Sequence, residues 1–308
     1  MTTETSAPIT DWIHTAWSDH AADPEAVMNR FDKGMALVTE AKDLAPLATL
    51  IAHVAANHLG RYEDGLAFMD KLSALDVFAA GDSNSMTVTR CKAILHMCLG
   101  DDEKAMAFED AGHPAELPRA STSVRVRMAV ACALGEQGQP ERSRALYKEA
   151  IALASYGPKE GDPAASALAM NSNNMACDLE ERENRSAEDD ALLELASKTA
   201  RIYWEIAGSW VQIKLAEYRL AMTFIALGNG ELATEHANLA LAICEDNFAS
   251  DEEFFFPYEA LARARFCEGD RDGANEARDK MASALEEASD GNRDWFTESL
   301  ADLDKHLA

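Results

Sequence analysis

The side chains best suited to chemistry are eight histidines and six cysteines, and their spacing matches no common catalytic or metal-binding motif. His53 and His58 stand five residues apart, whereas two metal ligands on one face of an α-helix usually stand four apart. The cysteines include no Cys-x-x-Cys pair, and no histidine stands near them at metal-ligand spacing. A glycine-rich phosphate loop and a Gly-x-Ser-x-Gly turn are also missing. The sequence therefore predicts a protein that is not an enzyme and that holds no metal or cofactor.

The charge balance narrows the class of partner. Aspartate and glutamate number 54 against 28 lysines and arginines, which gives a net charge of -26. This charge repels phosphate groups, so we expect neither nucleic acid nor an anionic membrane as a partner. The acidic residues either keep the outer helix surfaces soluble, which we favour, or attract a basic partner.

The first residues, MTTETSAPITDW, lack the basic flank and the apolar segment of a signal peptide. No apolar run in the sequence approaches the length of a membrane span. We therefore expect a cytoplasmic protein.

The elements that would position a binding site are predicted to be helices. Hydrophobic residues make up 47% of the chain and prolines number only nine, which favours packed helices. An apolar helical stretch, a glycine within a polar turn and a second helix with a charged start recur along the chain. The turn glycines are Gly60, Gly100, Gly138, Gly228 and Gly269.

The spacing of these glycines indicates a further hairpin that has no turn glycine. Successive glycines are separated by 40, 38 and 41 residues, but 90 residues separate Gly138 from Gly228. We expect a sixth hairpin in this gap, with its corner near Glu183 and Asn184. The repeat length is then about 42 residues.

Small residues recur on both sides of each turn. Alanine stands seven residues before four of the five glycines, and His53 stands there before the fifth. Glycine, alanine or serine stands five residues after each. Small side chains at these places allow two antiparallel helices to approach closely where they cross.

This order of residues resembles the tetratricopeptide repeat over about residues 45–285. The resemblance is clearest at Ala221, Phe224, Gly228, Ala233 and Ala240. The period of about 42 residues exceeds the usual 34 and is similar to that of the longer-helix type found in kinesin light chains. Repeats of that type often contain an Asn-Asn-Leu-Ala element, which residues 173–176 resemble. A HEAT-type array has a similar period but lacks the glycine-centred turn, so it ranks second. The resemblance implies an all-α, right-handed α-solenoid of about six antiparallel helical hairpins.

Helical caps are expected at both ends, because a terminal repeat would otherwise leave an apolar face in water. Residues 1–44 are predicted as an N-terminal helical cap, residues 45–285 as the repeat array and residues 286–308 as a C-terminal capping helix. The N-terminal cap is expected to contain a short helix around Trp12 and Trp17 and a helix from Pro24 to Lys42. The closing helix is expected from Asp294 to Leu307, with Trp295 and Phe296 packed inward.

In such repeats the first helix of each pair lines a concave face, and the resemblance implies that a partner binds there. The candidate residues are Asn57, Arg90, Arg125, Asn173, Asn174, Tyr218, Met222, Phe256, Glu259 and Arg263. Arginine suits carboxylates, and an asparagine amide can bond to a peptide backbone. We therefore expect a protein or extended peptide as the partner, with acidic groups or a free carboxylate. The alternative is that these arginines pair with neighbouring acidic side chains.

The segment DEEFFFPYEA at residues 251–260 is the most aromatic part of the chain. Phe254, Phe255 and Phe256 either wedge between the last two repeats or offer a hydrophobic anchor for a partner. Pro257 before an apolar-periodic run marks a helix beginning.

Three functions remain open from the sequence. The first is an interaction module that binds a protein or peptide on its concave face. The second is a regulator in which a peptide or small molecule tightens the superhelix and so changes how the chain acts on another protein. The third is an enzyme with an unfamiliar groove site, or a structural scaffold.

Overall fold

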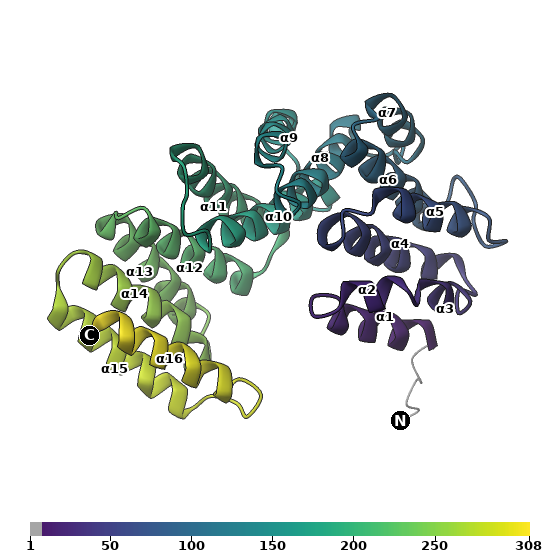
Figure 1. The fold of residues 1–308 in the computed structure, drawn as a ribbon. Coiled ribbons are helices and arrows are strands. Elements are labelled where there is room, and N and C mark those ends of the chain that lie inside the picture. The colour runs from purple at the N-terminus through teal and green to yellow at the C-terminus, as the bar shows by residue number, and fades with distance from the viewer. Residues whose placement is uncertain (1–7) are drawn as a thin grey trace. The chain divides into compact units, whose positions relative to one another are not determined.

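A computed structural model describes residues 8–308, and all regular elements in this range are helices (Figure 1). The first half contains α1 (Pro8–Asp19), α2 (Pro24–Met28), α3 (Phe31–Met35), η1 (Ala41–Asp43), α4 (Leu44–His53), η2 (Val54–His58), α5 (Tyr62–Ser73), α6 (Ser83–Leu99), α7 (Asp102–Ala111), α8 (Arg119–Glu136), α9 (Pro140–Leu153) and η3 (Ala154–Tyr156). The second half contains α10 (Pro163–Glu180), α11 (Ala187–Ala207), α12 (Trp210–Ala226), α13 (Gly230–Asp246), η4 (Asp251–Phe254), α14 (Phe255–Cys267), α15 (Arg271–Glu286) and α16 (Arg293–Leu307). Within residues 8–308, no helix combines the length and apolar character that crossing a bilayer requires.

The chain divides into two compact units inside the region of the repeats. Unit 1 consists of Met1–Pro158 and Asp162–Ala167, and unit 2 consists of Lys159–Gly161 and Leu168–Ala308. Buried apolar side chains form clusters within each unit. Each unit therefore has a core of its own.

The predicted hairpins appear as packed pairs of neighbouring helices. In unit 1, α4 packs with α5, α6 with α7 and α8 with α9, and in unit 2 α12 packs with α13 and α14 with α15. The hairpin expected near Glu183 and Asn184 corresponds to α10 and α11, which are joined by residues 181–186. Ser186 starts α11 with a capping box, in which its hydroxyl and the Asp189 carboxylate each accept a hydrogen bond from the other residue's backbone N–H.

The turn glycines and the small residues beside them explain why the helices pair closely. All five turn glycines have a left-handed backbone, with φ from 60 to 82°, a conformation that disfavours any residue with a Cβ atom. The alanines at 93, 131, 221 and 262 are completely buried. A Cβ atom on Gly65 would lie 2.9 Å from the Cβ atom of Ala55, so this crossing requires glycine.

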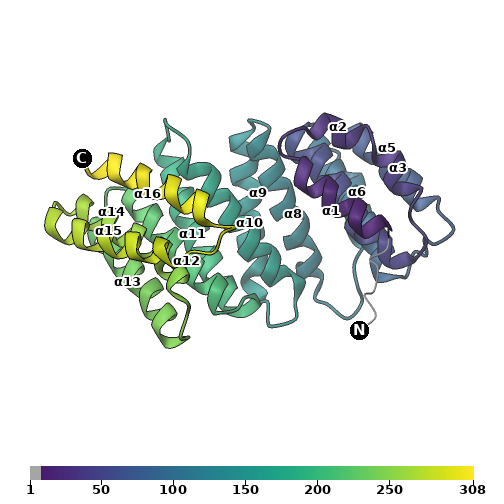
Figure 2. The same cartoon turned by 90° about the horizontal axis from the view of Figure 1, so that it is seen from below.

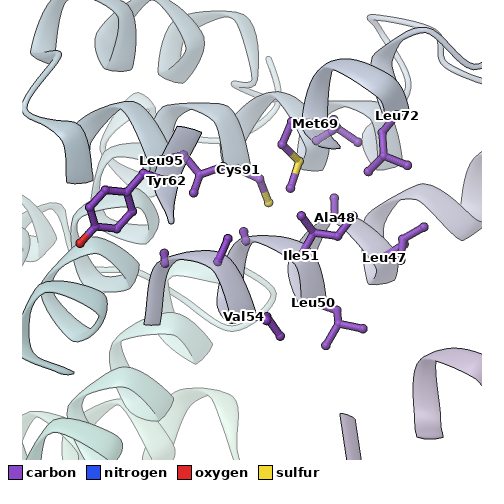
Figure 3. Close-up of a cluster of buried hydrophobic side chains, with 14 of the residues drawn as sticks. Leu47, Ala48, Leu50, Ile51, Val54, Tyr62, Met69, Leu72, Cys91 and Leu95 are labelled. Carbon is purple, nitrogen blue, oxygen red and sulfur yellow. The ribbon is translucent and has the colours of Figure 1, made fainter. Parts of the chain in front are cut away.

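The helix α4 forms the centre of the unit 1 core. Figure 3 shows Ala48 and Ile51 pointing toward the side of Met69, while Leu50 and Val54 point to the opposite side of the helix. All five side chains are completely buried. Because α4 is covered on two sides, its burial contributes to the stability of several neighbouring helices at once.

The closing helix packs on the last hairpin of unit 2. Figure 2 shows α16 beside α14 and α15, and the three helices are in contact. Phe255 of α14 stacks on Phe296 of α16, with ring centroids 3.9 Å apart, so Phe296 is buried as expected. The expectation that Trp295 packs inward is wrong, because its side chain is 56% exposed. Consecutive residues point about 100° apart around a helix, so with Phe296 buried Trp295 lies at the edge of the packed face, beside Phe256.

The helix expected from Pro24 to Lys42 is broken into α2, α3 and η1. Its start is correct, since the Asp23 side chain caps α2 by accepting a hydrogen bond from the backbone N–H of Ala26. Further along, the Trp12 ring of α1 lies so close to Gly34 that a Cβ atom there would be 2.7 Å from it. This close approach requires glycine at position 34, within α3.

Candidate functional site

Three of the residues predicted on the inner face of unit 2 gather around one hollow. Asn173 of α10, Tyr218 of α12 and Phe256 of α14 line it. The other lining residues, which the sequence pattern did not select, are Trp204, Gln212, Leu215, Arg219 and Trp295. The volume of this unit 2 hollow is about 310 Å³, at the lower end of the range for ligand pockets.

One wall of the hollow is aromatic and partly open to solvent. The Phe256 ring lies 5.6 Å from the Tyr218 ring and 4.7 Å from the Trp295 ring, measured between centroids. Trp295 is 56% exposed and Leu215 is 41% exposed. Large apolar side chains are thus held in place by α12, α14 and α16 but remain accessible, as in surfaces that bind another apolar group.

A buried polar network lies behind this wall. The Tyr218 hydroxyl donates a hydrogen bond to Glu259 over 3.1 Å, and burial holds the pKa of Tyr218 well above its usual value, so the phenol stays protonated. Arg263 donates to Glu259 over 3.0 Å and to Asp302 over 2.9 Å. Two carboxylates therefore neutralise Arg263. This arginine pairs with neighbouring acidic side chains, which was the alternative to binding a partner.

Arg219 is the cationic residue that lines the hollow. Its Nη1 atom donates to Glu180 over 2.6 Å. Its Nε atom is buried and has no hydrogen-bond partner among the residues that the structure describes. A buried donor without a partner is costly, and this atom is closed off from the hollow.

The other candidates of unit 2 do not line the hollow. Asn174 is exposed, in contrast to Asn173, whose amide contacts the Cys177 sulfur at 3.8 Å. Met222 packs in a cluster with Ala221, whose other buried members come from α13 and α14. Met222 thus supports the core beside the hollow.

In unit 1, Arg90 and Arg125 form a pair of half-buried arginines. Burial and the neighbouring charge of Arg90 lower the pKa of Arg125 to about 10, and burial also lowers the pKa of Arg90. Arg90 donates to the Thr87 hydroxyl over 3.1 Å, but across residues 8–308 neither arginine forms an ion pair. Half-buried guanidinium groups of this kind suit a carboxylate from a partner, although the charge of Asp162 already acts on Arg125.

Asn57 forms hydrogen bonds within unit 1. Its amide donates to Glu136 over 2.7 Å, and its backbone carbonyl accepts a hydrogen bond from the Gln137 side chain. Glu136 ends α8 and Gln137 follows it. Asn57 therefore fixes the turn η2 against α8.

The inference that His53 and His58 cannot share a helix face is wrong. Their Nε2 atoms are 3.1 Å apart, because η2 is a π-helical turn. The spacing of five residues was interpreted with α-helical geometry, which this turn does not have.

The tryptophans of the sequence would have identified more of the hollow. Trp204 lies on the second helix of its hairpin and Trp295 on the closing helix, whereas the predicted positions came only from first helices. The chain has five tryptophans, and their large apolar rings are worth considering wherever they lie.

No family model matches this chain, and no curated protein matches it. The residues of the hollow are therefore interpreted from their own chemistry.

Proposed function

We propose that the chain is a tetratricopeptide-like solenoid that binds an extended peptide segment of another protein, and that the unit 2 hollow receives a large apolar side chain of this segment. The observation that carries the proposal is the accessible aromatic wall of Tyr218, Phe256 and Trp295. Aromatic side chains held by their neighbours lose little freedom on binding and dominate the energy of many interfaces.

The regular chemistry of the turns supports the repeat assignment. Five turns share a left-handed glycine, and buried small residues flank them at the same distances. A supersecondary unit that recurs in this way is typical of stacked helical hairpins. In such arrays the exposed face of the first helices is the usual binding surface.

The polar groups around the hollow suit a peptide backbone. The Asn173 amide can donate and accept hydrogen bonds, as an extended peptide requires. Since Arg263 is neutralised by Glu259 and Asp302, recognition in unit 2 is apolar, and acidic groups of a partner would bind at Arg90 and Arg125 of unit 1.

A set of short fluorescent peptides tests this proposal. Their central residue is Trp, Phe, Leu, Ala or Asp, and binding is measured by fluorescence anisotropy. We expect the aromatic and leucine peptides to bind and the alanine and aspartate peptides not to bind. Replacing Trp295 by Ala should weaken binding about tenfold or more, as for a residue at the centre of an interface.

Phe248→Ala is the matched control, because Phe248 is 96% exposed and does not line the hollow. It should bind the peptides as the wild type does. Equal binding by the wild type and the Trp295→Ala variant would exclude the hollow as the receptor, and binding that ignores the central side chain would exclude the proposed recognition.

A further inference from the structure

Three histidine side chains of unit 1 meet between the end of α1 and the turn η2. Ring nitrogens of His20, His53 and His58 all lie within 4.8 Å of one another. The Nε2 atoms of His53 and His58 are 3.1 Å apart. A tetrahedral zinc ion binds imidazole nitrogens at about 2.0 Å, which places two of them about 3.3 Å apart. One pair is therefore already at coordinating distance, and His20 has only a short way to move.

The local backbone of η2 brings His53 and His58 together. Five residues advance about 140° beyond a full turn of an α-helix, so the two rings would point in different directions. The N–H group of Leu59 instead bonds to the carbonyl of Val54, five residues earlier, over 3.2 Å. This π-helical bond widens the turn and returns the fifth residue to the same face. Such single π turns are frequent at functional sites.

Outer contacts hold the rings in suitable orientations. His20 Nδ1 lies 2.5 Å from the carbonyl oxygen of Trp17, so its Nδ1–H group donates there and Nε2 is left to coordinate. The Asn57 side chain is hydrogen-bonded to His53 and donates to Glu136 over 2.7 Å. Metal-binding histidines are commonly oriented by carbonyl and carboxylate groups in this way.

The surroundings of His53 and His58 disfavour a positive charge on either ring. Burial, together with the neighbouring charges of His58 and His20, lowers the pKa of His53 to about 4. Burial likewise lowers the pKa of His58.

Aromatic packing is the competing explanation for the cluster. The Trp17 ring lies 4.9 Å from His20 and 5.2 Å from His53, measured between centroids. Packing accounts for these ring contacts, and a hydrogen bond between the Nε2 atoms of His53 and His58 accounts for their approach. Neither requires a nitrogen of a third ring, that of His20, to converge on the same point.

We propose that His20, His53 and His58 bind one divalent transition metal ion of the zinc class. Imidazole nitrogens favour zinc, cobalt, nickel and copper, whereas magnesium and calcium prefer oxygen ligands. Three protein ligands leave a fourth position for water or for a group of a bound partner. The ion fastens the segment after α1 to η2, so its binding stabilises the first helices of unit 1 against α4. This inference does not depend on the peptide hollow of unit 2.

Cobalt(II) and zinc(II) titrations of the chelator-treated full chain test the proposal. Cobalt should give the absorption bands of a tetrahedral site at one equivalent, and zinc should displace cobalt and raise the melting temperature. The variants His20→Gln and His58→Gln should each lower the affinity about tenfold or more. His14→Gln is the matched control, since His14 is exposed on the same helix as Trp17, and it should bind as the wild type does.

His20→Gln also guards against loss of folding, because His20 lies after α1 rather than inside the core helices. Failure of cobalt to give a saturable tetrahedral spectrum would overturn the proposal. So would an unchanged spectrum in both histidine variants, which would place the ion elsewhere. A thiolate-to-cobalt absorption band would place it on a cysteine and overturn the proposal as well.

Discussion

Glu217 of α12 links three helices of unit 2, and replacing it by glutamine is expected to loosen them. Its buried carboxylate accepts hydrogen bonds from Arg201 of α11 and from His236 of α13, the latter over 2.7 Å. A hydrogen bond to a charged group contributes about 1.5–3 kcal/mol and a neutral one about 0.5–1.5 kcal/mol. Loss of the charge from both bonds should therefore lower the free energy of opening these helices by about 2–3 kcal/mol.

Native-state hydrogen exchange measures this change within unit 2 alone. The amides of α11, α12 and α13 should exchange about 30- to 150-fold faster in Glu217→Gln, since each 1.4 kcal/mol corresponds to a factor of ten. Glu205→Gln is the control, because Glu205 is an exposed partner of the same Arg201, and it should change exchange by less than about fivefold. Equal acceleration in the two variants would refute a special role for the buried carboxylate.

The wild type and the Glu217→Gln variant should also differ in how their stability depends on pH. Burial alone would raise the pKa of Glu217, but the hydrogen bonds from His236 and Arg201 together lower it below its ordinary value of 4.5. The unfolded state then binds a proton more readily than the folded state, so this stabilisation is present above pH 4.5 and is lost as the pH falls through the folded pKa. The difference in protection between wild type and Glu217→Gln should shrink over this range. A constant difference would contradict the argument.

Two further substitutions test how the helices of unit 2 are built. Gly228→Ala should lower stability by about 1 kcal/mol, because its φ of 73° is strained for alanine, while the added Cβ atom itself would meet nothing within 4 Å. Gly291 also has open space around it but no left-handed φ, so Gly291→Ala should have little effect in the same thermal melts. Phe255→Ala should lower the free energy of unfolding by about 3–5 kcal/mol, because it leaves a cavity beside Phe296. Phe248→Ala should leave urea unfolding unchanged. Similar losses for the two variants would contradict the assignment of Phe255 to the core.

The hairpins could be predicted because their causes are local in sequence. A left-handed turn calls for glycine, and a close helix crossing calls for a small residue, so Gly228 and Ala221 indicate structure without knowledge of the rest of the chain. The spacing of such residues also located the pair α10 and α11, whose corner has Glu183 and Asn184 in place of glycine.

The candidate site could be predicted only in part, because contacts with other helices decide how each side chain is used. Tyr218 and Phe256 do meet at the hollow, as their shared face suggested. Arg263 was expected to be available, but Asp302 of α16, 39 residues later, pairs with it. The approach of His53 to His58 depends on a π turn that the spacing of residues does not reveal.

Fluorine NMR of the chain labelled with 5-fluorotryptophan tests the central claim most directly. Trp204 and Trp295 line the unit 2 hollow, whereas Trp12 and Trp17 lie on α1 of unit 1. Addition of a peptide with a central aromatic residue should shift the Trp204 and Trp295 resonances in a saturable manner and leave those of Trp12 and Trp17 in place. Binding of the peptide with no shift at Trp204 and Trp295 would contradict the assignment of the hollow as the binding site.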